Sequence, residues 1–127
     1  MELELVAAPI TKFNELDVLA ALKGIDIKCI QFFESVDTRT YVVLDNGSRK
    51  QVFAPLYVFE EMLPKDVFFR CGWSHVVNVS RINSFFMLND TTLVMDCGEE
   101  ILIPRYQRHT IFKIMEQMWF AQQRQIG

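Results

Sequence analysis

The sequence contains no long uninterrupted apolar stretch. A helix that crosses a bilayer needs about 18 or more consecutive apolar residues, whereas the apolar residues of this chain are scattered. The N-terminal residues Met-Glu-Leu-Glu-Leu are acidic, while a secretory signal peptide begins with basic residues. The sequence therefore predicts a cytoplasmic protein that does not associate with a membrane.

Cysteine is scarce and widely spaced. The three cysteines, Cys29, Cys71 and Cys97, are an odd number and include no Cys-x-x-Cys pair, so neither a disulfide framework nor a zinc site is indicated. A metal site of Cys71 and His75 with Cys97 and His109 can be imagined, but the spacing does not support it. We expect three reduced thiols, mostly buried, and no metal or other cofactor.

The motifs of the common enzyme classes are missing. The chain has no Gly-rich phosphate loop, no His-Glu-x-x-His and no Gly-x-Ser-x-Gly. The acids Asp96, Glu99 and Glu100 lie near a predicted turn, where carboxylates usually face solvent. Cys71 and His75 are the remaining candidates for a nucleophile with its base. We expect the protein not to be an enzyme.

A surplus of basic residues is also missing. The net charge is −3, whereas strong DNA binders usually carry a basic surplus. The charges are unevenly distributed: residues 1–34 hold six acids and three lysines, and residues 101–127 hold four bases and one acid. A protein that is acidic overall can still present a basic face, so the balance does not exclude an anionic partner.

Apolar residues are abundant enough for one folded domain. Half of the 127 residues are hydrophobic and 11 are Phe, so the chain can bury a core. Strong turn signals, such as Asp45-Asn46-Gly47-Ser48, separate short β-type segments, which is typical of an antiparallel β-sandwich or open barrel. The predicted strands cover residues 25–34, 39–44, 49–53, 67–70, 75–79, 82–89, 92–96 and 101–104. In the first of them, one face carries Ile25, Ile27, Cys29 and Gln31.

Three short helices complete the prediction. The first covers residues 15–22, after an Asn14 cap and before a stop at Gly24. The second begins near Pro55 and ends at Pro64. The third covers residues 108–123 and carries one apolar stripe, which either docks onto the sheet or forms a homodimer contact. The stripe consists of Ile111, Ile114, Met115, Met118 and Trp119.

Three blocks of sequence carry a family resemblance. They are Ile-Gln-Phe-Phe-Glu at 30–34, Phe-Arg-Cys-Gly-Trp-Ser-His-Val-Val-Asn at 69–78, and Ile-Leu-Ile-Pro-Arg at 101–105. In order and spacing they resemble the LytTR family of bacterial DNA-binding domains, over residues 25 to about 118. On this basis we divide the chain into an N-terminal extension with a short helix, residues 1–24, and a LytTR-like DNA-binding domain with a C-terminal helix, residues 25–127.

The resemblance implies a transcriptional regulator that binds double-stranded DNA. In the family, loops and strand ends enter successive major grooves, and no recognition helix is used. Carried over residue by residue, the DNA-binding positions are Thr38, Arg39, Trp73, Ser74 and Arg105, to which we add Arg81 and Arg108. Arginine suits such positions because its fork can grip guanine O6 and N7 or straddle a phosphate. Arg81 and Arg108 would touch phosphate, which positions a protein without specifying sequence.

The chain departs from the family pattern at three positions. Gly72 and Trp73 stand where the family has His and Arg, and Pro104 stands where it has Ser. Trp73 can stack on a sugar or a thymine methyl, seat a protein partner, or belong to the core. Arg39 can pair with Asp37 or Glu34 instead of meeting DNA. Arg70, inside a strand, is expected to pair with an acid.

The departures leave a second interpretation open. The domain can be a protein–protein interaction module that keeps the fold and has lost DNA readout. The two interpretations differ in a placement: Arg39, Arg81, Arg105 and Arg108 converge on one face in the first and scatter in the second. Because only about two dozen residues precede the matched region, we also expect a regulatory protein partner or dimerisation, and not phosphorylation within the chain, to set activity.

Overall fold

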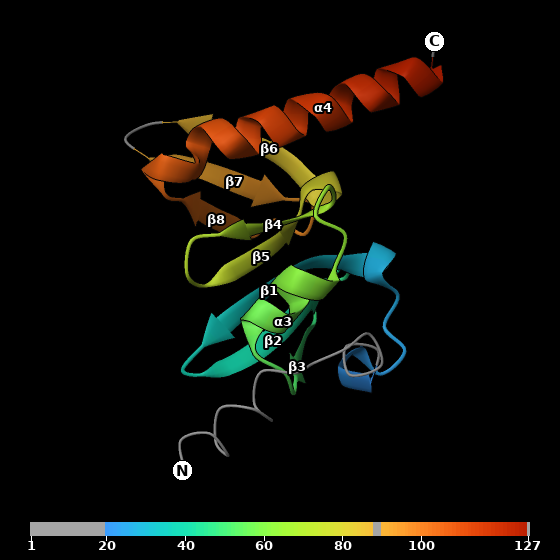
Figure 1. Cartoon of the computed structure of the whole chain (residues 1–127), viewed down its shortest axis with the longest axis vertical. Helices are drawn as coiled ribbons and strands as arrows, with labels where there is room; N and C mark the ends of the chain where they lie inside the picture. Colours follow the sequence, from blue (N-terminus) through green and yellow to red (C-terminus); the bar gives the residue numbers. More distant parts are fainter. Residues whose placement is uncertain (1–19, 88–89, 127) are drawn as a thin grey trace, which may run out of the picture.

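The fold consists of two antiparallel sheets and two main helices (Figure 1). The computed structural model describes residues 20–87 and 90–126, with side chains to Trp119. The strands are β1 (Ile30–Val36), β2 (Arg39–Leu44), β3 (Arg49–Val52), β4 (Phe68–Cys71), β5 (His75–Asn78), β6 (Ile82–Met87), β7 (Thr91–Met95) and β8 (Glu100–Ile103). The helical elements are η1 (Ile27–Cys29), α3 (Leu56–Met62), η2 (Val79–Arg81), η3 (Arg105–Gln107) and α4 (Arg108–Ile126).

The strands form one five-stranded and one three-stranded sheet. The first has the order β3-β2-β1-β5-β4 and the second the order β6-β7-β8. Strand β1 is central to the larger sheet, because it pairs with β2 on one side and with β5 on the other. Two sheets packed face to face make a sandwich, so the predicted mainly antiparallel β fold with short helices is confirmed.

One face of the larger sheet packs against α3. Phe33 of β1 stacks on Phe59 of α3 with ring centroids 4.4 Å apart, and both side chains are fully buried. Leu22 joins the same core. Helix α3 begins after Pro55, whose fixed φ suits a helix start, and it ends shortly before Pro64, which cannot continue it.

The other face of the larger sheet packs against the smaller sheet. Phe32 and Val77 share a core with Leu93 and Ile101 of the smaller sheet and with Ile111 of α4. Helix α4 lies across the smaller sheet (Figure 1), and Phe112 contacts Phe85 of β6 with ring centroids 4.9 Å apart. Four residues of the predicted apolar stripe therefore dock onto the sheet, namely Ile111, Ile114, Met115 and Met118, while Trp119 is 55 % exposed.

The predicted strand over 25–34 is wrong in its first half. Residues Ile27–Cys29 form a 3-10 turn in which the Asp26 side chain accepts a hydrogen bond from the Lys28 amide, and extended structure begins at Ile30. Ile27 and Cys29 are therefore exposed and do not share a buried face with Gln31. Cys71 is buried and Cys97 partly buried, so the expectation of mostly buried thiols fails at Cys29.

The other predicted boundaries agree within three residues, and 39–44 agrees at both ends. The predicted helix over 15–22 lies mostly outside the described residues, although 20–22 are helical and a turn at Lys23 and Gly24 follows. Residues 88–89 of the predicted strand 82–89 also lie outside them. In the part of the chain that the structure describes, no helix is long and apolar enough to span a bilayer.

Candidate nucleic-acid interface

Three connections meet at one end of the sandwich. They are the β1–β2 turn, the β4–β5 turn and the junction of β8 with α4, and we call residues 37–39, 72–74 and 104–108 together the loop end. The Ser35 amide donates a hydrogen bond to the Ser74 carbonyl across 2.8 Å, which joins the first two connections. A Cβ placed on Gly72 would lie 3.1 Å from Pro104 Cγ, so the second and third are in contact. Figure 1 shows all three connections on the same side.

The β1–β2 turn is tight and strained. Val36 pairs with Arg39, so only Asp37 and Thr38 lie in the turn, with φ values of 49° and 66°. A turn with two left-handed residues matches the twist of a hairpin but normally uses Asn and Gly. Thr38 is β-branched, and this conformation costs such a residue about 1–2 kcal/mol. Strained residues of this kind concentrate at functional sites, which fits the predicted role of Thr38.

Arg39 follows this turn and is exposed to solvent. The alternative of a pair with Glu34 does not occur, because Glu34 accepts a hydrogen bond of 2.6 Å from Arg49 and lies 3.7 Å from His75 Nε2. Within residues 20–87 and 90–126, Arg39 forms no ion pair with Asp37 or any other acid. Its guanidinium is therefore available to an external anion.

The β4–β5 turn presents Trp73 to solvent. The side chain is 88 % exposed, so Trp73 is not a core residue. Ser74 beside it is also exposed, and Gly72 adopts a left-handed φ of 64°. Arg70 braces the turn: its Nε donates to the Gly72 carbonyl and its Nη2 to the Trp73 carbonyl, over 3.0 and 2.9 Å. Its Nη1 binds Glu60 at 2.8 Å, which confirms the expected pairing of Arg70 with an acid.

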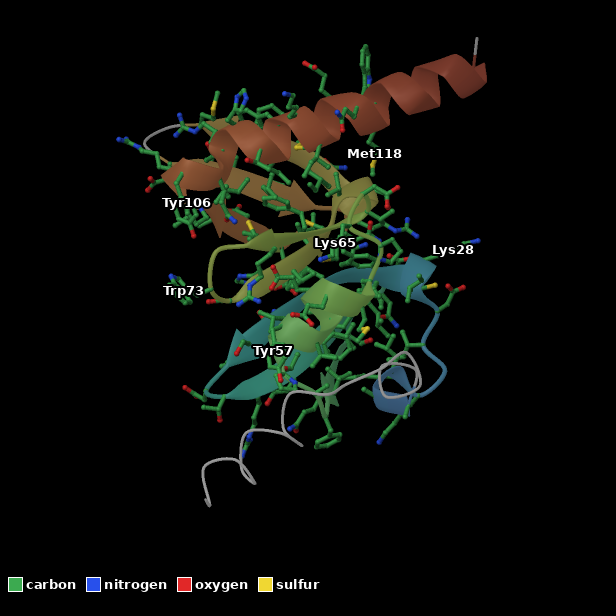
Figure 2. The ribbon with its side chains drawn as sticks, viewed as in Figure 1. Lys28, Tyr57, Lys65, Trp73, Tyr106 and Met118 are labelled. Carbon is green, nitrogen blue, oxygen red and sulfur yellow. The ribbon has the colours of Figure 1, made fainter. Side chains whose placement is uncertain are left out.

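The junction of β8 with α4 presents a cation and an aromatic ring. Pro104 precedes the 3-10 turn Arg105–Gln107, in which Arg105 is exposed and Tyr106 is 74 % exposed. Tyr106 and Trp73 lie on the same side of the molecule (Figure 2). Sequence reasoning missed Tyr106, although its position next to Arg105 was a usable signal. Arg108 begins α4 and is partly buried, and its Nε has no hydrogen-bond partner within the described residues.

Arg81 lies at the opposite end of the larger sheet. Strand β5 runs between the β4–β5 turn and η2, so Trp73 and Arg81 are separated by its length. Arg81 donates from Nε and Nη2 to the Lys28 carbonyl, and its Nη2 lies 3.2 Å from Asp45. Lys28 and Trp73 appear on opposite sides of Figure 2. The fold thus brings Arg39, Arg105 and Arg108 to one end and leaves Arg81 at the other.

A cluster of ion pairs joins the two sheets. Arg49 of β3 binds Glu34 at 2.6 Å and holds Glu99 of the β7–β8 turn with two hydrogen bonds of 2.6 and 2.8 Å. The hydrogen bond to Glu34, followed by that to Glu99, raises the pKa of Arg49 above its ordinary value. Because Arg49 compensates these two carboxylates, they repel an approaching polyanion less than free acids would.

Cys71 and His75 are cross-strand neighbours but not a reactive pair. They face each other in the register of β4 and β5. Burial raises the pKa of Cys71 to about 12, so its thiol stays protonated at neutral pH. Burial also lowers the pKa of His75, with the nearby Glu34 opposing that shift. The Cys71 thiol is directed to the Leu102 carbonyl at 4.0 Å, and no hydrogen bond joins it to His75 within the described residues.

Asn78, in the block 69–78 that carries the resemblance, is a structural residue. Its side chain is 2 % exposed and donates a hydrogen bond of 2.8 Å to the Ile30 carbonyl. The side-chain oxygen accepts from the Ser80 amide and hydroxyl and so caps the 3-10 turn that ends in Arg81. Asn78 therefore fixes the exit of β5 against the start of β1 and does not reach the loop end.

An antiparallel β-sandwich that gathers exposed arginines, hydroxyls and aromatic rings on loops at one end has the features of a β-rich DNA-binding domain. The chain belongs to the LytTr DNA-binding domain family, whose model matches residues 20–116. The fold is similar to the LytTr DNA-binding domain of a Bacillus cereus protein described as a methyl-accepting/DNA response regulator. The two share 28 % identity and a TM-score of 0.64, over 72 % of this chain and 84 % of the other. Among curated proteins the comparison finds no match.

Proposed function

We propose that this protein is a sequence-specific transcriptional regulator that reads the major groove of DNA with its loop end. The observation that carries the proposal is the convergence of Arg39, Trp73 and Arg105, which come from three separate connections and are all exposed. Neither arginine forms an ion pair within the described part of the chain. The proposal places the protein with DNA in a bacterial cytoplasm and assigns it no covalent chemistry.

The side chains of the loop end suit distinct contacts. Arg105 and Arg39 have free guanidinium forks that match guanine O6 and N7. Ser74 offers a hydroxyl to phosphate oxygens, and Thr38 would do so by giving up the hydrogen bond that its Oγ1 donates to the Asp37 carbonyl. Arg108, at the base of the junction, adds a charge that positions without specifying. Trp73 offers an apolar surface to a thymine methyl. Arg81 is left out of this interface, because its fork already binds Lys28 and Asp45 at the opposite end.

The affinity of a single domain is expected to be modest. Each good base contact is worth ~1–3 kcal/mol, and Gly72 and Pro104 supply no side-chain donor where the family pattern has His and Ser. A pair of domains on two half-sites would restore affinity, since each added domain brings its own phosphate and base contacts. We therefore include a homodimer, or a complex with a regulatory protein, in the proposal.

The second candidate function is a protein–protein interaction module on the same fold. It is favoured by an open pocket of about 530 Å³ between β6 and α4, which has both apolar and polar lining residues. Phe85, Phe112, Met115 and Met118 line this pocket away from the loop end. An interaction module would use this surface and leave the arginines of the loop end without a partner.

Selection of the purified protein on a random duplex library at low salt separates the two candidates. The normal protein should enrich a repeated motif, Arg105→Ala should lose part of it, and Arg81→Ala should retain it as a matched control at the opposite end. Low salt is needed because phosphate contacts weaken steeply as salt rises. Absence of any enriched motif with the normal protein would overturn DNA reading and make the interaction module the leading candidate.

A further inference from the structure

Gln107 connects two parts of the loop end that are distant in sequence. Its Oε1 accepts a hydrogen bond of 2.7 Å from the Gly72 amide, and its Nε2 donates one of 2.9 Å to the Arg70 carbonyl. Gln107 ends the 3-10 turn that contains Arg105, while Gly72 precedes Trp73 in the β4–β5 turn. The oxygen and the nitrogen of the Gln107 side-chain amide thus both bind the β4–β5 strand pair and hold the β8–α4 junction against it.

Arg70 closes the same turn from its other side. Its guanidinium donates to the carbonyls of Gly72 and Trp73, and Glu60 of α3 holds the guanidinium in place. The turn backbone is therefore bound by Gln107 and Arg70 together. Side chains that satisfy backbone groups in this way fix the conformation of a short turn that would otherwise depend on water.

Gly72 and Pro104 make this close contact feasible. A Cβ at position 72 would meet Pro104 Cγ at 3.1 Å, tighter than most such contacts, and Gly72 has a φ of 64° that other residues adopt at a cost. Two of the three departures from the family pattern, Gly72 and Pro104, therefore lie against each other. They remove two polar side chains and allow the turn and the junction to pack directly.

We propose that Gln107 is a positioning residue that holds the β4–β5 turn against the β8–α4 junction, so that Trp73 and Arg105 meet DNA as one preformed unit. This inference rests on the proposed function. Its physical basis is preorganisation, because a turn that is already ordered loses less conformational entropy on binding. The hydrogen bonds of Gln107 would then contribute to affinity without Gln107 touching DNA.

A double-mutant cycle tests whether Gln107 acts through Trp73. Gln107→Met keeps the length of the side chain and removes both hydrogen bonds, and it is measured in the normal protein and in Trp73→Ala on the selected duplex. We expect a roughly 3- to 10-fold loss of affinity in the normal background and almost none in the Trp73→Ala background. An equal loss in both backgrounds means that the two residues act independently, which would overturn the inference.

A control variant and a hydrogen-exchange measurement support the interpretation of the double-mutant cycle. Gln51→Met, on an exposed position of β3, is the matched control and should change affinity in neither background. Hydrogen exchange of the Gly72 amide should accelerate in Gln107→Met, and unchanged exchange would also count against the inference. If Gln107→Met does not fold, Arg70→Lys takes its place in the same cycle, because it keeps a charge for Glu60 and loses the two-pronged hold on the turn.

The outcomes separate this inference from the proposed function. A normal protein that selects no duplex overturns both, since there is then no DNA contact to position. A normal protein that selects a motif, together with additive losses in the cycle, overturns only the role of Gln107. Non-additive losses with faster exchange at Gly72 support both.

Discussion

The two ends of the larger sheet use the same residue types in opposite ways. At the end away from the loops, Gln31 donates to Asp45 over 2.7 Å and accepts from the Cys97 amide over 3.2 Å. Arg81 binds Asp45 and the Lys28 carbonyl at the same end. There the polar groups bind one another. At the loop end, Arg39, Trp73 and Arg105 are exposed. The side chain of Gln107 points inward and binds the backbone of the β4–β5 turn.

The difference shows that an arginine is better judged by its partners than by its exposure. The Arg81 side chain keeps a third of its surface exposed, yet its fork is filled by groups of its own chain. Arg39 and Arg105 follow strand ends just as Arg81 does, but they bind no acid within the described residues. A guanidinium that binds groups of its own chain stabilises the fold, whereas one that binds none is available to a ligand.

Removing both open forks should have the largest effect on DNA binding. The double variant Arg39→Ala and Arg105→Ala should lower affinity by roughly 30-fold or more, since each good base contact is worth ~1–3 kcal/mol. The melting temperature should stay the same, because both side chains are exposed and form no ion pair within the described residues. Titration of a labelled duplex at one fixed salt concentration measures the loss.

A charge-matched variant controls for the lost charges. Lys28→Ala with Lys65→Ala also removes two positive charges, but from exposed positions outside the loop end (Figure 2). Its affinity should fall much less than that of the arginine variant. Equal losses in the two variants would mean that net charge, and not the loop end, governs binding.

Removing Arg81, whose guanidinium is bound by groups of its own chain, should lower stability and leave DNA binding almost unchanged. Arg81→Ala should lower the free energy of unfolding by about 1–2 kcal/mol, through loss of a charged hydrogen bond to the Lys28 carbonyl and of a partly exposed ion pair with Asp45. DNA affinity should change less than about twofold. Urea unfolding and duplex titration together check this prediction. A large loss of affinity with unchanged stability would indicate that Arg81 contacts DNA.

Thr38→Gly should relieve the strain in the β1–β2 turn, so that stability rises while DNA binding weakens. Thr38→Gly removes the penalty of a left-handed β-branched residue but loosens the unfolded chain, so a gain of about 0.5–1 kcal/mol in unfolding free energy is expected. Loss of the hydroxyl should weaken DNA binding slightly. Thr92→Gly, within β7, is the comparison variant and should destabilise. A destabilised Thr38→Gly protein would show that the turn is not strained.

The smallest predicted effect is a pH dependence that comes from His75. Burial lowers its pKa, so the unfolded state takes up a proton more readily than the folded state does. The contribution of His75 to stability is therefore complete above its ordinary pKa of 6.5 and is lost as the pH falls below that value. Chemical unfolding at pH 8 and pH 5.5 should show this fall, and His75→Gln should reduce it. An identical slope in the variant would exclude His75 as the cause.

The sequence predicted the strands well where turns and alternation agreed. The hairpin formed by β2 and β3 has both, and its first strand was predicted at both ends. The start of β1 was not, because Ile27 and Cys29 alternate with polar residues as in a half-buried strand. The side-chain cap from Asp26 to the Lys28 amide bends that segment into a 3-10 turn instead.

The candidate site residues could be named from the sequence, but their positions in the fold could be predicted only in part. From the sequence, Trp73 and Arg81 were placed in one DNA interface. Because Trp73 precedes β5 and Arg81 follows it, the length of that strand separates them. No signal in the sequence indicated contacts between residues that are far apart along the chain. The hydrogen bonds of Gln107 to Gly72 and Arg70 and the contact of Pro104 with Gly72 depend on the packing of the two sheets, which composition and spacing do not encode.

The convergence of the three connections has a consequence for protein engineering. A recognition helix can be excised as a peptide or grafted onto another scaffold, because its contact residues are close in sequence. Here the contact residues are distributed from Thr38 to Arg108, and the pairing of β1 with β5 and the packing of the two sheets bring them together. No short fragment of the chain contains this surface. Retargeting such a domain therefore means exchanging turns on an intact sandwich, with positions 72 and 104 changed together.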